Sequence, residues 1–132
     1  MLPITFVFVS LFALAQVAIT LRVGLYRGRS GVRFLDGGDQ HLLRIMRAHG
    51  NFTETVPIGL MVLGATEGVG APGWLLWGMG GLFVLARGSH YLTVTLRGSG
   101  QGRRLGMVGS FTTYSVGAAY VLYQLGTSPS MW

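Results

Sequence analysis

The first 21 residues, Met1 to Leu21, contain no charged side chain. An α-helix rises about 1.5 Å per residue, so a run of this length can cross the roughly 30 Å hydrocarbon layer of a bilayer. The run has neither the basic start nor the short apolar core that is typical of a cleaved signal peptide. We therefore expect a first transmembrane helix over residues 1–21.

The composition also favours a membrane protein. Only 11% of the residues are charged and 50% are hydrophobic, whereas about a quarter of the residues of an ordinary soluble domain are charged. Cysteine is absent, so any thiol in the chemistry of this protein has to come from a bound molecule. The 132 residues leave room for a single domain, residues 1–132.

Three further helical spans are expected, over about residues 40–67, 72–96 and 105–126. The segments that join spans one and two and spans three and four contain several arginines, namely Arg22, Arg27, Arg29, Arg33, Arg97, Arg103 and Arg104. The segments on the opposite side contain none. Because arginine is retained in the cytoplasm, we expect both termini to lie outside it. The tryptophans Trp74, Trp77 and Trp132 fall near the outer boundary, as in an aromatic belt.

Glycine is frequent, with 22 residues, and recurs at close spacing in the pairs Gly64 with Gly68 and Gly102 with Gly106. In lipid, helices associate by close approach of their backbones, so these pairs predict tight helix packing. Four spans make a slim bundle with little interior for polar side chains. We therefore expect a homo-oligomer whose subunits share an interface.

Two classes of ligand are not expected. The net charge of +6 could indicate nucleic acid, but the arginines lie beside apolar segments and form no solvated stripe. His41, His49 and His90 have no cysteine or carboxylate cluster beside them, so no metal site is expected.

A polar stripe runs along the second span. At 100° per residue, Arg44, Arg47, Asn51 and Glu54 fall within a sector of roughly 80°. Glu54 lies about 20 Å along the helix from His41, near the bilayer midplane, where a charged side chain costs at least about 2.5 kcal/mol. A partner for this carboxylate is therefore expected.

Arg87 in the third span lies at a similar depth, so an ion pair with Glu54 is expected. A buried network that only fixes helix register would be an alternative explanation of these polar residues. Pro57 cannot donate a hydrogen bond to the carbonyl of Thr53, and we expect a kink or a loosened turn there.

Such a network would not explain the surplus of positive charge at the same end of the bundle. The arginines concerned are Arg22, Arg44, Arg47, Arg103 and Arg104. An anionic ligand that enters from the cytoplasmic side would balance this charge.

Residues 47–57, RAHGNFTETVP, resemble the second-helix signature of the MAPEG family, the membrane-associated proteins of eicosanoid and glutathione metabolism. The chain length, the four spans and the arginine in the third helix are similar to that family. The Asp36-Gly37-Gly38 turn and the His49-Gly50 pair are most similar to its small bacterial branch. The resemblance implies an all-α, integral membrane four-helix bundle that assembles as a homotrimer in the inner membrane.

The resemblance further implies that glutathione is a co-substrate, held between neighbouring subunits near the cytoplasmic side. Glutathione carries two carboxylates, an ammonium and a thiol. Arg47 and either Arg22 or Arg27 would pair with the carboxylates, and Glu54 with the ammonium. Asn51 would bind polar backbone atoms of the ligand.

The remaining candidate contacts with the ligand are Arg44, His49, Arg87, His90 and Tyr91. In the family an arginine at the start of the last helix stabilises the thiolate, and here Arg103 and Arg104 both occupy that place. The thiolate would attack a lipophilic electrophile or a hydroperoxide dissolved in the bilayer, which implies a transferase or a peroxidase. Well-studied relatives carry tyrosines at the spacing that His90 and Val94 occupy here.

Two other classes of function remain open. A small four-span transporter could use Glu54 as a proton-coupled site, although small multidrug exporters carry their essential carboxylate in span one, where this chain has none. A non-catalytic membrane scaffold would use the polar cluster for assembly only.

Overall fold

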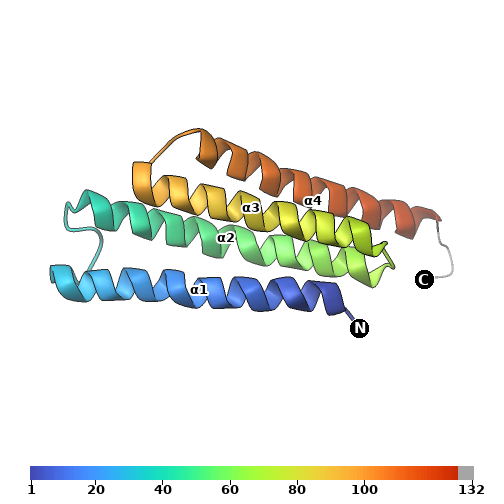
Figure 1. Cartoon of the computed structure of the whole chain (residues 1–132), viewed down its shortest axis with the longest axis horizontal. Helices are drawn as coiled ribbons and strands as arrows, with labels where there is room; N and C mark the ends of the chain where they lie inside the picture. Colours follow the sequence, from blue (N-terminus) through green and yellow to red (C-terminus); the bar gives the residue numbers. More distant parts are fainter. Residues whose placement is uncertain (128–132) are drawn as a thin grey trace.

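The computed structural model describes residues 1–127, and these form four helices joined by short connections (Figure 1). The helices are α1 (Pro3–Ser30), α2 (Gln40–Gly68), α3 (Gly73–Arg97) and α4 (Gln101–Thr127). Successive helices run in opposite directions, so the start of α1 and the end of α4 lie at the same end of the bundle. The expected all-α four-helix architecture is confirmed. Trp132 lies outside the described residues.

Two helices extend beyond the expected spans. α1 continues past Leu21 to Ser30 and ends at Gly31, whose φ of 70° is left-handed. The uncharged run shows how many residues can cross the hydrocarbon layer. The helix itself continues beyond that layer until a residue such as Gly31 ends it. α4 begins at Gln101. The arginines that were expected in the connections but lie on helices are Arg22, Arg27, Arg29, Arg97, Arg103 and Arg104.

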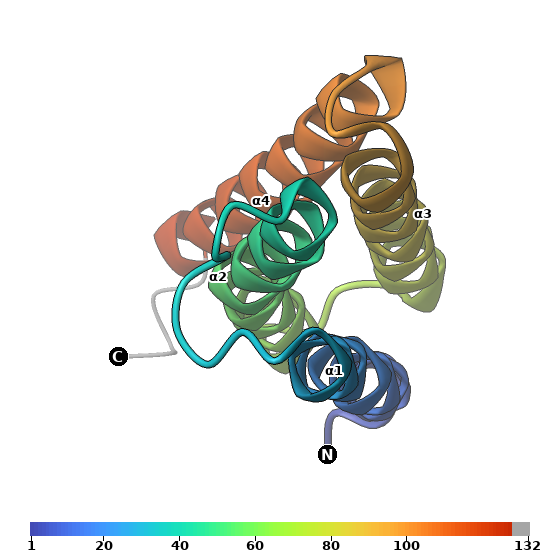
Figure 2. The same ribbon diagram turned by 90° about the vertical axis from the view of Figure 1, so that its left-hand side faces the viewer.

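α2 and α3 each contact the other three helices (Figure 2). α1 packs on α2 and less extensively on α3, and it does not contact α4 within the described residues. The core is aromatic where α1, α2 and α3 meet. The ring of Phe12 lies 5.9 Å from that of Phe52 and 5.1 Å from that of Phe83, measured between centroids.

α3 and α4 approach each other closely because of glycine. A Cβ atom built on Gly106 would lie 2.5 Å from the carbonyl oxygen of Ala86 and 2.6 Å from the Cβ of His90. A Cβ on Gly64 would make only ordinary contacts, the nearest at 3.6 Å. Tight packing through glycine is therefore confirmed for the α4 pair but not for the pair that includes Gly64.

The outer surface of the bundle is apolar. Large hydrophobic side chains are exposed on every helix, for example Leu14 (73%), Leu85 (73%) and Leu122 (70%). Among the described helices, α1 and α4 are long and apolar enough to cross a membrane on length and composition alone. α2 carries the polar stripe, which lowers its hydropathy.

Two of the four acidic residues cap helices. The Glu67 carboxylate, at the end of α2, accepts hydrogen bonds from the backbone N–H groups of Ile4 (2.9 Å) and Thr5 (2.7 Å) at the start of α1. Asp39 precedes α2 and accepts from the N–H groups of His41 (2.8 Å) and Leu42 (3.0 Å). A carboxylate at a helix N-terminus satisfies unpaired N–H groups and stabilises the helix dipole.

Substitution Glu67→Gln should destabilise the fold by about 1 kcal/mol, because it removes the negative charge from the N-terminus of α1. Thermal unfolding in detergent, with Asp36→Asn as the matched loss of one carboxylate, measures the effect. Equal melting temperatures for the two variants would contradict the capping role of Glu67.

Asp39 should titrate below the ordinary range of an aspartate. The hydrogen bond from the Leu42 N–H, and next the one from the Tyr26 hydroxyl, hold the pKa of Asp39 below its usual value. Because the folded-state pKa is lowered, the stability that Asp39 contributes is present at neutral pH and is lost as the pH falls below about 4. Carboxyl NMR measures the titration, and a midpoint at the ordinary value would contradict the cap.

Candidate functional site

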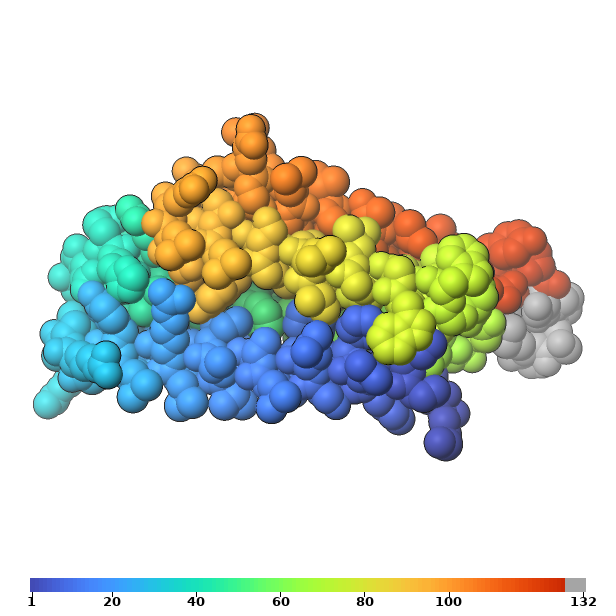
Figure 3. Space-filling model, in the orientation of Figure 1, coloured from blue at the N-terminus to red at the C-terminus, as the bar shows by residue number. Residues whose placement is uncertain are grey.

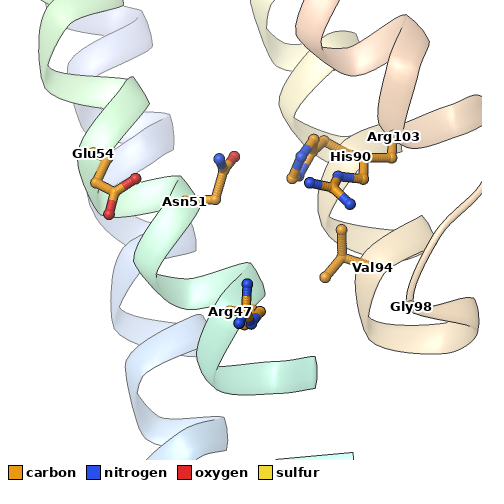
Figure 4. A pocket seen from close by; sticks show the side chains of 7 residues that line it. All are labelled: Arg47, Asn51, Glu54, His90, Val94, Gly98 and Arg103. Carbon is orange, nitrogen blue, oxygen red and sulfur yellow. The ribbon is translucent and has the colours of Figure 1, made fainter. Parts of the chain in front are cut away.

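A cavity of about 270 Å³ lies between α2, α3 and α4, near the arginine-rich end of the bundle (Figure 4). Its walls combine two guanidinium groups, an amide, a carboxylate and an imidazole. The residues that line it are Arg47, Asn51, Glu54, His90, Val94, Gly98 and Arg103. Several of the side chains that were expected to bind one ligand therefore line the same cavity.

Helical periodicity explains how these residues come to share a cavity. Arg47, Asn51 and Glu54 are separated by four and three positions on α2, which places them on one face of that helix. His90, Val94 and Gly98 follow one another every four residues along α3. Together the two rows form facing walls.

Arg103 completes the cavity from the first turn of α4. Its guanidinium extends across the gap toward Asn51 (Figure 4). The close approach of Gly106 to Ala86 holds this turn of α4 against α3. The N-terminal end of a helix also carries a partial positive charge, so both the side chain and the backbone of this turn favour an anion.

Several polar atoms at the cavity have no partner among the described residues. Asn51 Oδ1 and His90 Nε2 are buried and make no hydrogen bond, although burial of an unsatisfied polar group costs about 1–3 kcal/mol. Glu54 is exposed at the cavity mouth. The site therefore offers hydrogen-bond donors, acceptors and a surplus of positive charge to a polar ligand.

The expected ion pair between Glu54 and Arg87 is wrong. Arg87 is 2% exposed, and its Nη1 donates a hydrogen bond to Thr55 Oγ1 at 2.6 Å. Thr55 is one residue beyond Glu54, and this 100° step turns it toward α3 while Glu54 faces outward. Within residues 1–127, Nε and Nη2 of Arg87 have no hydrogen-bond partner.

Thr55 also connects to α4. The hydroxyl of Tyr114 donates to the carbonyl oxygen of Thr55 at 2.7 Å, and Thr55 Oγ1 donates to the carbonyl oxygen of Asn51 at 2.6 Å. Thr55, Arg87 and Tyr114 therefore link α2, α3 and α4 through hydrogen bonds. Thr55 and Tyr114 were not expected at the site. A tyrosine in an apolar helix is nevertheless a usable signal, because its buried hydroxyl needs a partner.

Of the two adjacent arginines on α4, Arg103 lines the cavity and Arg104 is exposed outside it. Arg44 is half-buried beside Gly98, where a Cβ on the glycine would lie 3.3 Å from Arg44 Nε. Arg44 is therefore next to Gly98 but does not line the cavity.

The remaining candidates lie elsewhere in the same chain. Arg22 Nη1 is 3.4 Å from the hydroxyl of Tyr91, on the side of α3 that faces α1. His49 Nε2 lies 3.1 Å from Thr20 Oγ1 of α1. Arg27 Nη1 donates to the carbonyl oxygen of Arg33 at 3.2 Å and so supports the connection to α2. Arg22, Arg27, His49 and Tyr91 are not part of this cavity within the single chain.

The fold and the cavity place the chain in the class of membrane four-helix bundles that carry a polar, cationic site at one end. The MAPEG family model matches residues 5–123, and the chain belongs to this family. The family consists of membrane four-helix bundles and includes glutathione transferases and peroxidases. Searches of curated proteins and of solved structures find no significant match.

Substitution Gly106→Ala should destabilise the bundle, because the added Cβ meets the backbone of α3 and forces α4 away. Overpacking of this kind costs about 1–3 kcal/mol. Gly126→Ala is the matched control, since a Cβ there meets nothing within 4 Å. Thermal unfolding of both variants measures the difference, and equal stability would contradict the close contact between α3 and α4.

Proposed function

We propose that the cavity binds glutathione and that the protein is a glutathione transferase or peroxidase that acts on lipophilic substrates in the membrane. The observation that carries the proposal is the meeting of Arg47 and Arg103 with Asn51, Glu54 and His90 around one cavity. Membership of a family that includes such enzymes supports it.

The groups of glutathione match the groups of the cavity. A carboxylate of the tripeptide pairs with Arg47, and its ammonium pairs with Glu54. The unpartnered Asn51 Oδ1 and His90 Nε2 take the polar backbone of the ligand.

Arg103 stabilises the thiolate in this proposal. A free thiol has a pKa of about 8.5, so little of it is ionised at neutral pH, and a nearby guanidinium lowers that pKa because it favours the anion. The thiol proton leaves to solvent. The sulfur then forms a bond to an electrophilic carbon and expels its leaving group. Alternatively, it forms a bond to the terminal oxygen of a hydroperoxide while the O–O bond breaks and an alcohol leaves; a second glutathione then reduces the resulting sulfenic acid, giving glutathione disulfide and water.

We further propose a homotrimer in the inner membrane, with the arginine-rich end in the cytoplasm. Glu54 and Arg47 are both exposed on the single chain, at a level where an open surface would place them against lipid. A neighbouring subunit would cover the cavity mouth and remove this cost. Bound glutathione would then lie at the interface between two copies.

The two arginines of α4 provide a matched test. Arg103→Ala should weaken glutathione binding about tenfold in calorimetry, as expected for loss of one charged hydrogen bond, and should abolish the ultraviolet absorbance of the bound thiolate. Arg104→Ala should change neither. Equal behaviour of the two variants, or no binding by the unaltered protein, would sink the proposal.

The polar stripe gives a second test. Arg47→Ala and Glu54→Ala should each weaken glutathione binding about tenfold, because each removes a charged partner of the ligand. Light scattering in detergent shows whether the oligomer persists in both variants. Binding that survives both substitutions would argue against this cavity as the glutathione site.

A further inference from the structure

A second, apolar groove of about 330 Å³ lies between α1 and α3, with α2 beneath it. Figure 3 shows the face on which α1 and α3 lie side by side, with atoms of α2 visible between them. The groove extends from Leu11 to Ile19 along α1, which is about 12 Å of helix. Its opposite wall is built from residues of α3 between Val84 and Leu92.

The arginine-rich end of this groove carries a polar group. Tyr91 lines the groove. Arg22 lies over the ring of Tyr91: its guanidinium carbon is 5.9 Å from the ring centroid, and its Nη1 is 3.4 Å from the tyrosine hydroxyl. Arg22 is one helical turn beyond Ile19, so it stands where the apolar wall of α1 ends. The groove is therefore apolar along most of its length and cationic at one end.

No carboxylate in the described part of the chain neutralises Arg22. Glu67 and Asp39 cap helices, Glu54 lines the other cavity, and Asp36 lies in the connection between α1 and α2. The groove wall also includes Arg87, but that side chain is only 2% exposed and its Nη1 is bound to Thr55. Arg22 is therefore the guanidinium available to an anion at this end.

We propose that the groove binds an anionic phospholipid from the leaflet at the arginine-rich end, with one acyl chain in the groove and the phosphate on Arg22. The groove is apolar, and its volume of about 330 Å³ can hold part of one acyl chain. A guanidinium matches a phosphate in geometry and charge, and basic sites between membrane helices select anionic headgroups. This site is independent of the glutathione cavity.

Native mass spectrometry of protein equilibrated with equal amounts of phosphatidylglycerol and phosphatidylcholine tests the proposal. The unaltered protein should retain phosphatidylglycerol preferentially. Gly88→Leu should abolish this retention, because Gly88 lines the groove and a Cβ there meets nothing within 4 Å, so the added side chain fills the groove. Gly81→Leu is the control, since that glycine has equal space but does not line the groove.

Arg22→Gln should reduce phosphatidylglycerol retention about tenfold, as loss of one charged hydrogen bond predicts, while Arg29→Gln on the same helix should leave it unchanged. Equal retention of the two lipids, or equal effects of Gly88→Leu and Gly81→Leu, would overturn the proposal. So would an Arg22→Gln variant that keeps the lipid but loses glutathione, because Arg22 would then belong to a neighbour's cavity.

Discussion

The hydrogen bond from Arg87 to Thr55 fixes how α2 is rotated within the bundle. A guanidinium that is almost fully buried needs an acceptor, and within the described chain only the Thr55 hydroxyl provides one. Tyr114 binds the carbonyl oxygen of the same residue from α4. With Thr55 held between α3 and α4, the helical step places Asn51 at the cavity and Glu54 at its mouth.

The cavity is cationic because most of the acidic side chains lie elsewhere in the bundle. The chain has ten basic and four acidic residues, and two of the acids are engaged at helix ends by Ile4, Thr5, His41 and Leu42. Glu54 alone among the acids lines the cavity, together with two arginines. The excess is consistent with a ligand that brings more negative than positive charge, as glutathione does.

Much of the fold and part of the site could be predicted from the sequence. The number and order of helices follow from apolar runs, and the shared face of Arg47, Asn51 and Glu54 follows from helical periodicity alone. Glycine spacing correctly predicted the close contact at Gly106, but the same spacing at Gly64 and Gly68 gives only ordinary contacts. Each of these expectations rests on a sequence pattern within one helix.

Features that depend on two helices were harder to predict. Arg87 was paired with the wrong neighbour, because depth in the membrane cannot distinguish Glu54 from Thr55, whereas the rotation of α2 does. Arg103 and Arg104 are adjacent in sequence and 100° apart on α4, so the tilt of α4 against α3 was needed to tell which one lines the cavity. Ligand roles for all these residues stay predictions.

A structure of the protein in lipid at saturating glutathione tests the central claim most directly. The account predicts density for one tripeptide in each cavity, with a carboxylate at Arg47 and the sulfur at Arg103. An empty cavity, or a tripeptide bound elsewhere with Arg47 and Arg103 turned to bulk water, would contradict it.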